Sequence, residues 1–149
     1  MSHSSSGRHL DILLIEDNPA DVRLTEEAFR EEGSPTTLHV ARDGVDAIAY
    51  LRHEEPHGTS RRPDLILLDL NLPKLHGHDL LTVIKADPLL TAIPVVVLTT
   101  SQAGSDIYRS RDLGAECFVT KPDGPEEFLR VVRYVRDFWG TLDRGVAAA

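Results

Sequence analysis

The sequence predicts an α/β fold, in which a doubly wound, five-stranded parallel sheet carries helices on its faces. Apolar runs of strand length alternate with stretches that keep helical spacing, which is typical of parallel sheets covered by helices. Two of these runs, Leu10 to Ile15 and Leu65 to Leu68, are apolar almost throughout and lead directly into acidic residues. The 149 residues are the length of one domain, which can bury most of its unfolded surface without disulfides.

The first half of the chain contains two strand and helix units. Leu10 to Ile15 is the first strand, and Asn18-Pro19 opens a helix that Gly33 closes. The segment from Thr37 to Ala41 is short and half polar, which indicates a strand at an edge of the sheet. Asp43-Gly44 then begins the second helix.

A polar loop over residues 53–63 separates this half from three further units. The third strand, residues 65–69, leads to a helix that stops at the breaker Asp87-Pro88. The fourth strand, residues 93–98, is followed by a helix from Ser105 to Gly114.

The fifth strand covers residues 117–120, and Pro125 begins the last helix, because proline is tolerated best in a first turn. The apolar stripe of this helix continues to Phe138 and Trp139. We expect a disordered N-terminal tail over residues 1–9, one domain over residues 10–140 and a flexible C-terminal tail over residues 141–149.

Composition excludes several classes of function. A net charge of -8 disfavours binding to nucleic acid, because such binding relies on Lys and Arg to neutralise phosphates. No apolar stretch approaches the roughly 20 residues of a membrane span, and the N-terminus lacks the apolar core of a signal peptide. The single Cys117 lies in an apolar run, as a small buried residue would. We therefore expect a cytoplasmic protein that binds neither nucleic acid nor membranes.

Polar residues follow four of the predicted strands at the point where each ends. Glu16-Asp17 follow the first strand, Asp69 ends the third, Thr99 follows the fourth and Lys121 follows the fifth. Ligands of open parallel sheets bind beyond the carboxyl ends of the strands, so these side chains should meet at one edge. Clustered carboxylates repel one another unless a cation neutralises them, and oxygen ligands favour Mg²⁺.

These motifs together resemble the receiver domain of two-component response regulators. They are Glu16-Asp17, Asp69 with Asn71, Pro73 and Gly77 after it, Thr99, and Lys121-Pro122, and the match runs in order from about Leu10 to Trp139. The resemblance implies a flavodoxin-like fold with strand order 2-1-3-4-5 and five helices. It also implies a signalling protein rather than an enzyme.

The resemblance implies that Asp69 accepts a phosphoryl group from a histidine kinase. Asp17 and Asp69 would bind Mg²⁺ through their carboxylates, Asn71 would bind it through its backbone carbonyl, and Glu16 would act through water. An isolated Asp at a strand end more often caps the following turn. Here the other motif residues follow in the family's order along the chain, which favours the role of phosphoacceptor for Asp69.

Three further residues match functional positions of the family, and two of them, Thr99 and Phe118, would form its switch. Thr99 would hydrogen-bond to the phosphoryl group, and Lys121 would pair with another of its oxygens. Phe118 stands where the family carries the aromatic that turns inward with this hydroxyl, although a plain core aromatic is an equal alternative. Thr99 or Lys121 taken alone would indicate nothing unusual.

Further details resemble the single-domain regulators that pair with phytochrome-type histidine kinases. These are the Leu98-Thr99-Thr100-Ser101 run, the long loop over residues 53–63 and Phe138-Trp139 at the end of the last helix. Output would then pass through protein contacts. We expect a homodimer through the face of the fourth helix, fifth strand and last helix, with Val135, Phe138 and Trp139 at its centre. Alternatively, Trp139 folds back on its own domain.

Two other kinds of protein share parts of this pattern. Haloacid dehalogenase-like phosphatases also carry a nucleophilic Asp at a strand tip, but Asn71-Leu72-Pro73 replaces their Asp-x-Thr and the chain has no room for a cap domain. His53-Glu54-Glu55-Pro56-His57 matches the letters of a zinc protease motif, yet Pro56 breaks the helix which that site requires. His76 and His78 flank Gly77 in the loop after Asp69 and could approach the site, but we expect both to be solvated.

Overall fold

The computed structural model describes residues 9–53, 61–70, 72, 76–99 and 111–148, with side chains as far as Leu142. Its sheet has five parallel strands in the order β2-β1-β3-β4-β5, which confirms the predicted flavodoxin-like order. The strands are β1 (Leu10–Ile15), β2 (Thr36–Ala41), β3 (Leu65–Asp69), β4 (Val95–Thr99) and β5 (Cys117–Thr120).

The described residues contain α1 (Pro19–Glu32), α2 (Gly44–Leu51), α3 (Gly77–Ala86) and α5 (Pro125–Ala148). The helix predicted from Ser105 to Gly114 lies mostly outside the described residues. The prediction of a flexible tail over residues 141–149 differs from the structure, because α5 continues as a helix to Ala148. The division into tails and one domain stays a prediction.

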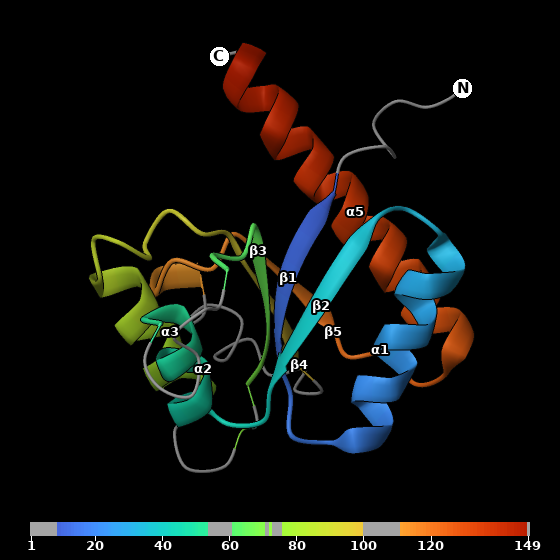
Figure 1. The fold of residues 1–149 in the computed structure, drawn as a ribbon, viewed down its shortest axis with the longest axis horizontal. Coiled ribbons are helices and arrows are strands. Elements are labelled where there is room, and N and C mark those ends of the chain that lie inside the picture. The colour runs from blue at the N-terminus through green and yellow to red at the C-terminus, as the bar shows by residue number, and fades with distance from the viewer. Residues whose placement is uncertain (1–8, 54–60, 71, 73–75, 100–110, 149) are drawn as a thin grey trace.

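The sheet separates two apolar cores (Figure 1). One lies between the sheet and α2 and α3, and the other between the sheet and α1 and α5. Alternate residues of each central strand face opposite cores: Leu13 and Ile15 point to the first, and Ile12 and Leu14 to the second. The central strands are thus buried on both faces, as their apolar sequences predict.

The corner between β1 and α1 is fixed by local hydrogen bonds. The side-chain oxygen of Asn18 caps α1 by accepting from the N–H groups of Ala20 at 2.9 Å and Asp21 at 3.3 Å. Pro19 occupies the first turn, and Gly33 ends the helix in the left-handed conformation with φ of 89°. This corner therefore holds the start of α1 directly beside the carboxyl end of β1.

The corner after β3 depends on close contact between two backbones. The N–H of Gly77 donates to the carbonyl of Leu70 at 3.1 Å. A Cβ at position 77 would lie 2.6 Å from Leu70 Cα, so only glycine fits without a shift of the backbone. His76 caps α3, its Nδ1 accepting from the N–H of His78 at 3.2 Å. Gly77 therefore returns the chain to the residue next to Asp69.

Across the described part of the chain, none of the helices combines the length and the apolar character that a membrane span requires.

Candidate functional site

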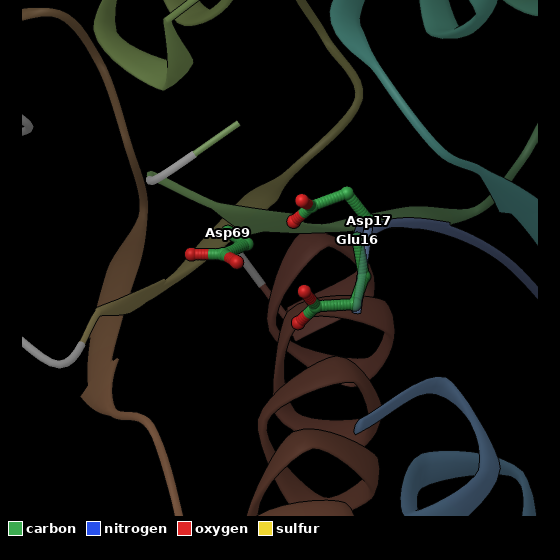
Figure 2. A group of neighbouring side chains, drawn as sticks. All are labelled: Glu16, Asp17 and Asp69. Atoms are coloured by element: carbon green, nitrogen blue, oxygen red, sulfur yellow. The ribbon is translucent and has the colours of Figure 1, made fainter. Parts of the chain in front are cut away.

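Three carboxylates meet where β1 and β3 end. Glu16 and Asp17 follow β1, Asp69 is the last residue of β3, and one oxygen from each lies within 4.8 Å of the others. Figure 2 shows the side chains of Glu16 and Asp17 extending to the same side, toward Asp69. Glu16 and Asp69 are only 2% and 3% exposed, whereas Asp17 is exposed. The site thus has a buried floor and an open side.

Lys121 brings a positive charge to these carboxylates. Its backbone N–H donates to the carbonyl of Thr99 at 2.8 Å, which ties the residue after β5 to the end of β4. Its ammonium lies 2.8 Å from Glu16 Oε1 and 3.1 Å from Asp69 Oδ2. With its side chain 10% exposed, Lys121 forms ion pairs that water screens weakly.

The protonation of this cluster follows from its burial. Burial raises the pKa of Glu16 from 4.5 to about 7; the hydrogen bond from Lys121 works against this shift, and the negative charge of Asp69 adds to it. Burial also disfavours the charged form of Lys121, but hydrogen bonds to Asp21 and Glu16 and the charge of Asp69 outweigh it and raise the lysine's pKa. Lys121 therefore stays charged.

The donor set suits a hard divalent cation. All three side chains in the group are carboxylates. Mg²⁺, Mn²⁺ and Ca²⁺ all bind readily to sites that offer oxygen ligands alone. Lys121 brings one positive charge, which Glu16 and Asp69 share with Asp21, so it does not neutralise these carboxylates by itself. Glu16, Asp17 and Asp69 therefore fit a metal. The fourth predicted ligand, Asn71, lies outside the described residues.

The two predicted switch residues occupy different depths. Thr99 ends β4 and is 4% exposed, one residue beyond Leu98, which pairs with Asp69 in the sheet. Phe118 is half-buried against the core under α2 and α3, and the guanidinium of Arg111 lies 5.3 Å from the centre of its ring. Thr99 therefore lies at the same end of the sheet as Asp69, whereas Phe118 packs against the core, and its predicted role in a switch stays a prediction.

Sequence reasoning missed Asp21, which lies in the first turn of α1. Its Oδ2 is 2.8 Å from the Lys121 ammonium, closer than Asp69. The available signal was an acid four residues after Asp17, but acids in first turns are common because they interact well with the helix dipole. The ion pair joins residues 100 positions apart, which local pattern does not reveal.

The other predicted residues lie away from this cluster or require correction. Val135 is fully buried in the core under α1 and α5, so its predicted place at the centre of an interface is wrong. Phe138 and Trp139 are half-buried and pack against the same core. His78 is 1% exposed rather than solvated, and its ring lies 5.2 Å from that of exposed His76.

The zinc alternative has little support in the described part of the chain. His53 follows α2 with φ of 57°, a left-handed conformation that does not continue a helix. The second histidine of that motif, His57, lies outside the described residues.

Comparison with known proteins agrees with this geometry. Residues 12–133 match the response regulator receiver domain. The response regulator Rcp1 of Synechocystis is 42% identical over 128 residues, which cover 86% of this chain and 87% of Rcp1. The crystal structure of the phosphorylated cyanobacterial phytochrome response regulator RcpA is similar with a TM-score of 0.83 and 46% identity, covering 89% of this chain and 94% of that one. The Mn²⁺-bound form of Rcp1 gives a TM-score of 0.80 at 42% identity, covering 87% and 94%.

Proposed function

The chain belongs to the response regulator receiver domain family, and we propose that it accepts a phosphoryl group from a histidine kinase on the carboxylate of Asp69. The observation that carries this proposal is the Lys121 ammonium 3.1 Å from Asp69 Oδ2, at the rim of a three-carboxylate group. A nucleophilic carboxylate, a cation beside it and oxygen ligands for a metal are the parts that phosphoryl transfer needs.

In this reaction an oxygen of Asp69 attacks phosphorus as the bond to the donor nitrogen of the kinase histidine breaks. Lys121 pairs with an oxygen of the transferred group, and Thr99 donates a hydrogen bond to another. Glu16, Asp17 and Asp69, with the carbonyl of Asn71, would hold Mg²⁺, which when bound offsets negative charge on the phosphoryl oxygens. The oxygen-only donor set supports Mg²⁺, and the Mn²⁺-bound structure of Rcp1 supports a divalent ion.

The similarity to RcpA and Rcp1 supports a phytochrome-type histidine kinase as the partner. We propose that the protein acts in the cytoplasm as a signalling protein without turnover activity of its own. The proposed homodimer would use the face of β5, α5 and the helix predicted from Ser105 to Gly114. Because Val135 is buried, Phe138 and Trp139 would carry this contact beside Tyr134, which is 49% exposed and stacks on Phe138.

The central test is phosphorylation by a small phosphodonor, followed by intact mass. The wild type should gain one phosphate in Mg²⁺ and none in chelator, and Asp69→Ala should gain none. Asp17→Ala should lose phosphorylation while staying folded, because removing one of several like charges relieves repulsion. Asp137→Ala, which removes an exposed carboxylate on α5, is the matched control and should behave as wild type.

A normal gain of phosphate by Asp69→Ala would contradict the assignment of the phosphoacceptor. Steady hydrolysis of small phosphate esters by the wild type would instead favour an aspartyl-phosphate hydrolase.

A further inference from the structure

Lys121 has three charged partners, and Asp21 differs from the other two. Among the described residues, the group of carboxylates that could hold a metal contains Glu16 and Asp69 but not Asp21. Asp21 projects from the first turn of α1, and its side chain is 21% exposed. Its contact with the ammonium, at 2.8 Å, is as short as that of Glu16.

The three contacts match the three N–H donors of an ammonium group. Glu16 and Asp69 contact it from the ends of β1 and β3, and Asp21 contacts it from α1. The lysine side chain is flexible, but contacts with three separate elements hold its Nζ atom in one place. The donor that reaches Asp69 is the one a phosphoryl group would use.

Two of these partners would have to be shared with a metal cation. When Glu16 and Asp69 turn their oxygens to a divalent ion, Lys121 loses part of its attraction to them and is also repelled by the like charge. Asp21 lies outside the metal group, so its ion pair with Lys121 does not compete with the metal. Without Asp21, the ammonium of Lys121 would then turn away from the site, whereas the ion pair with Asp21 would keep it there.

We propose that Asp21 is a positioning residue that keeps the ammonium of Lys121 beside Asp69 while a divalent cation is bound. This role rests on the proposed function, because the retained ammonium is the one that pairs with the phosphoryl group. A purely structural role is the alternative. Asn18 already caps α1, and the backbone carbonyl of Asp21 serves the helix by accepting from Thr25 Oγ1, so the carboxylate is not needed for either contact.

The first test observes the ammonium group itself by nitrogen NMR at low temperature. The chain has only three lysines, Lys74, Lys85 and Lys121, so the signals can be assigned with single variants. Lys85 is an internal reference, because its ammonium is 3.1 Å from Glu116 and 3.0 Å from the carbonyl of Ile93, away from the site. The variants are Asp21→Asn and the control Glu27→Gln, which removes the same charge from an exposed position on α1.

In the wild type and in Glu27→Gln, the Lys121 signal should persist throughout a titration with Mg²⁺. In Asp21→Asn it should be present in chelator, held by Glu16 and Asp69, and should disappear at saturating Mg²⁺ as the ammonium exchanges with water. The Lys85 signal should stay unchanged in all three proteins. Asp21→Glu should restore the Lys121 signal at least in part, because the carboxylate is kept.

The second test measures phosphorylation at saturating Mg²⁺ with a small phosphodonor. Asp21→Asn should react about tenfold more slowly than Glu27→Gln, the effect of losing one hydrogen bond to a charged group. If Asp21→Asn keeps its Lys121 signal in Mg²⁺ and reacts as fast as Glu27→Gln, Asp21 does not position the lysine. If the wild type is not phosphorylated at all, the proposed function fails, and the ammonium signals alone decide the role of Asp21.

Discussion

Replacement of Lys121 by methionine should destabilise the metal-free protein, and more so at high pH. Lys121→Met keeps most of the length of the side chain but removes the positive charge that pairs with Glu16 and Asp69, which are 2% and 4% exposed at their side chains. Breaking a buried ion pair by removing one partner typically costs about 3–5 kcal/mol. We expect a loss in this range at pH 8.5 in chelator.

The pH dependence follows from Glu16. Its pKa in the folded wild type is about 7, above the ordinary value of 4.5, so its favourable contribution is complete below pH 4.5 and is lost as the pH rises through 7. Lys121→Met removes the hydrogen bond that lowers this pKa, so Glu16 resists ionisation to a higher pH. Below pH 7 Glu16 is protonated in both proteins, whereas each pH unit above 7 adds up to about 1.4 kcal/mol to the difference.

Urea denaturation at pH 5.5 and pH 8.5 in chelator measures both effects. The difference between Lys121→Met and wild type should be about 2 kcal/mol larger at pH 8.5, as 1.5 pH units above 7 imply. Mg²⁺ should reduce the difference between Lys121→Met and wild type, because the ion neutralises the carboxylates that Lys121 contacts. Lys85→Met is the control, because Lys85 pairs with Glu116, whose side chain is 34% exposed, and its cost should be similar at both pH values. Equal losses for Lys121→Met at the two pH values would refute the reasoning.

Three further changes test the two corners beside the site and the proposed homodimer. Gly77→Ala should lower the free energy of unfolding by about 1–3 kcal/mol, because the new Cβ meets the backbone of Leu70; an unchanged urea midpoint would show that the contact yields easily. Asn18→Ala should cost about 1 kcal/mol through loss of the helix cap, measured in the same way. For the proposed homodimer, sedimentation should show a wild-type dimer at micromolar concentration and a helical but monomeric Phe138→Ala/Trp139→Ala; equal monomer masses would exclude it.

The boundaries of the strands show where sequence reasoning succeeds. β1, β3 and β5 have the predicted bounds, because each is an apolar run that ends at a charge or a polar residue. The fourth strand was predicted from Ile93 but begins at Val95. Ile93 is buried, and its apolar side chain is typical of a strand. Pro94, however, has no N–H to donate and contributes only its carbonyl, which accepts from the N–H of Ile66 at 2.9 Å.

The candidate site was predictable only in part. Glu16, Asp17, Asp69, Thr99 and Lys121 were identified because parallel strands bring their carboxyl ends to one edge. Asp21 was not, because its contact with Lys121 requires the packing of α1 beside the segment after β5, and helical periodicity gives no such pairing. The interface prediction erred at Val135 for a related reason, since an apolar stripe on a helix does not distinguish its own core from a partner.

The connection between β1 and α1 consists of Glu16, Asp17 and Asn18 alone. Asn18 caps the helix with its side chain and donates its own N–H to Glu16 Oε2 at 3.2 Å, and Pro19 restricts the backbone that follows. Such a short, internally bonded connection has no spare chain length with which to move. It therefore fixes Glu16 and Asp17 at the end of β1, so the two carboxylates keep their place relative to the start of α1 whatever binds between them and Asp69.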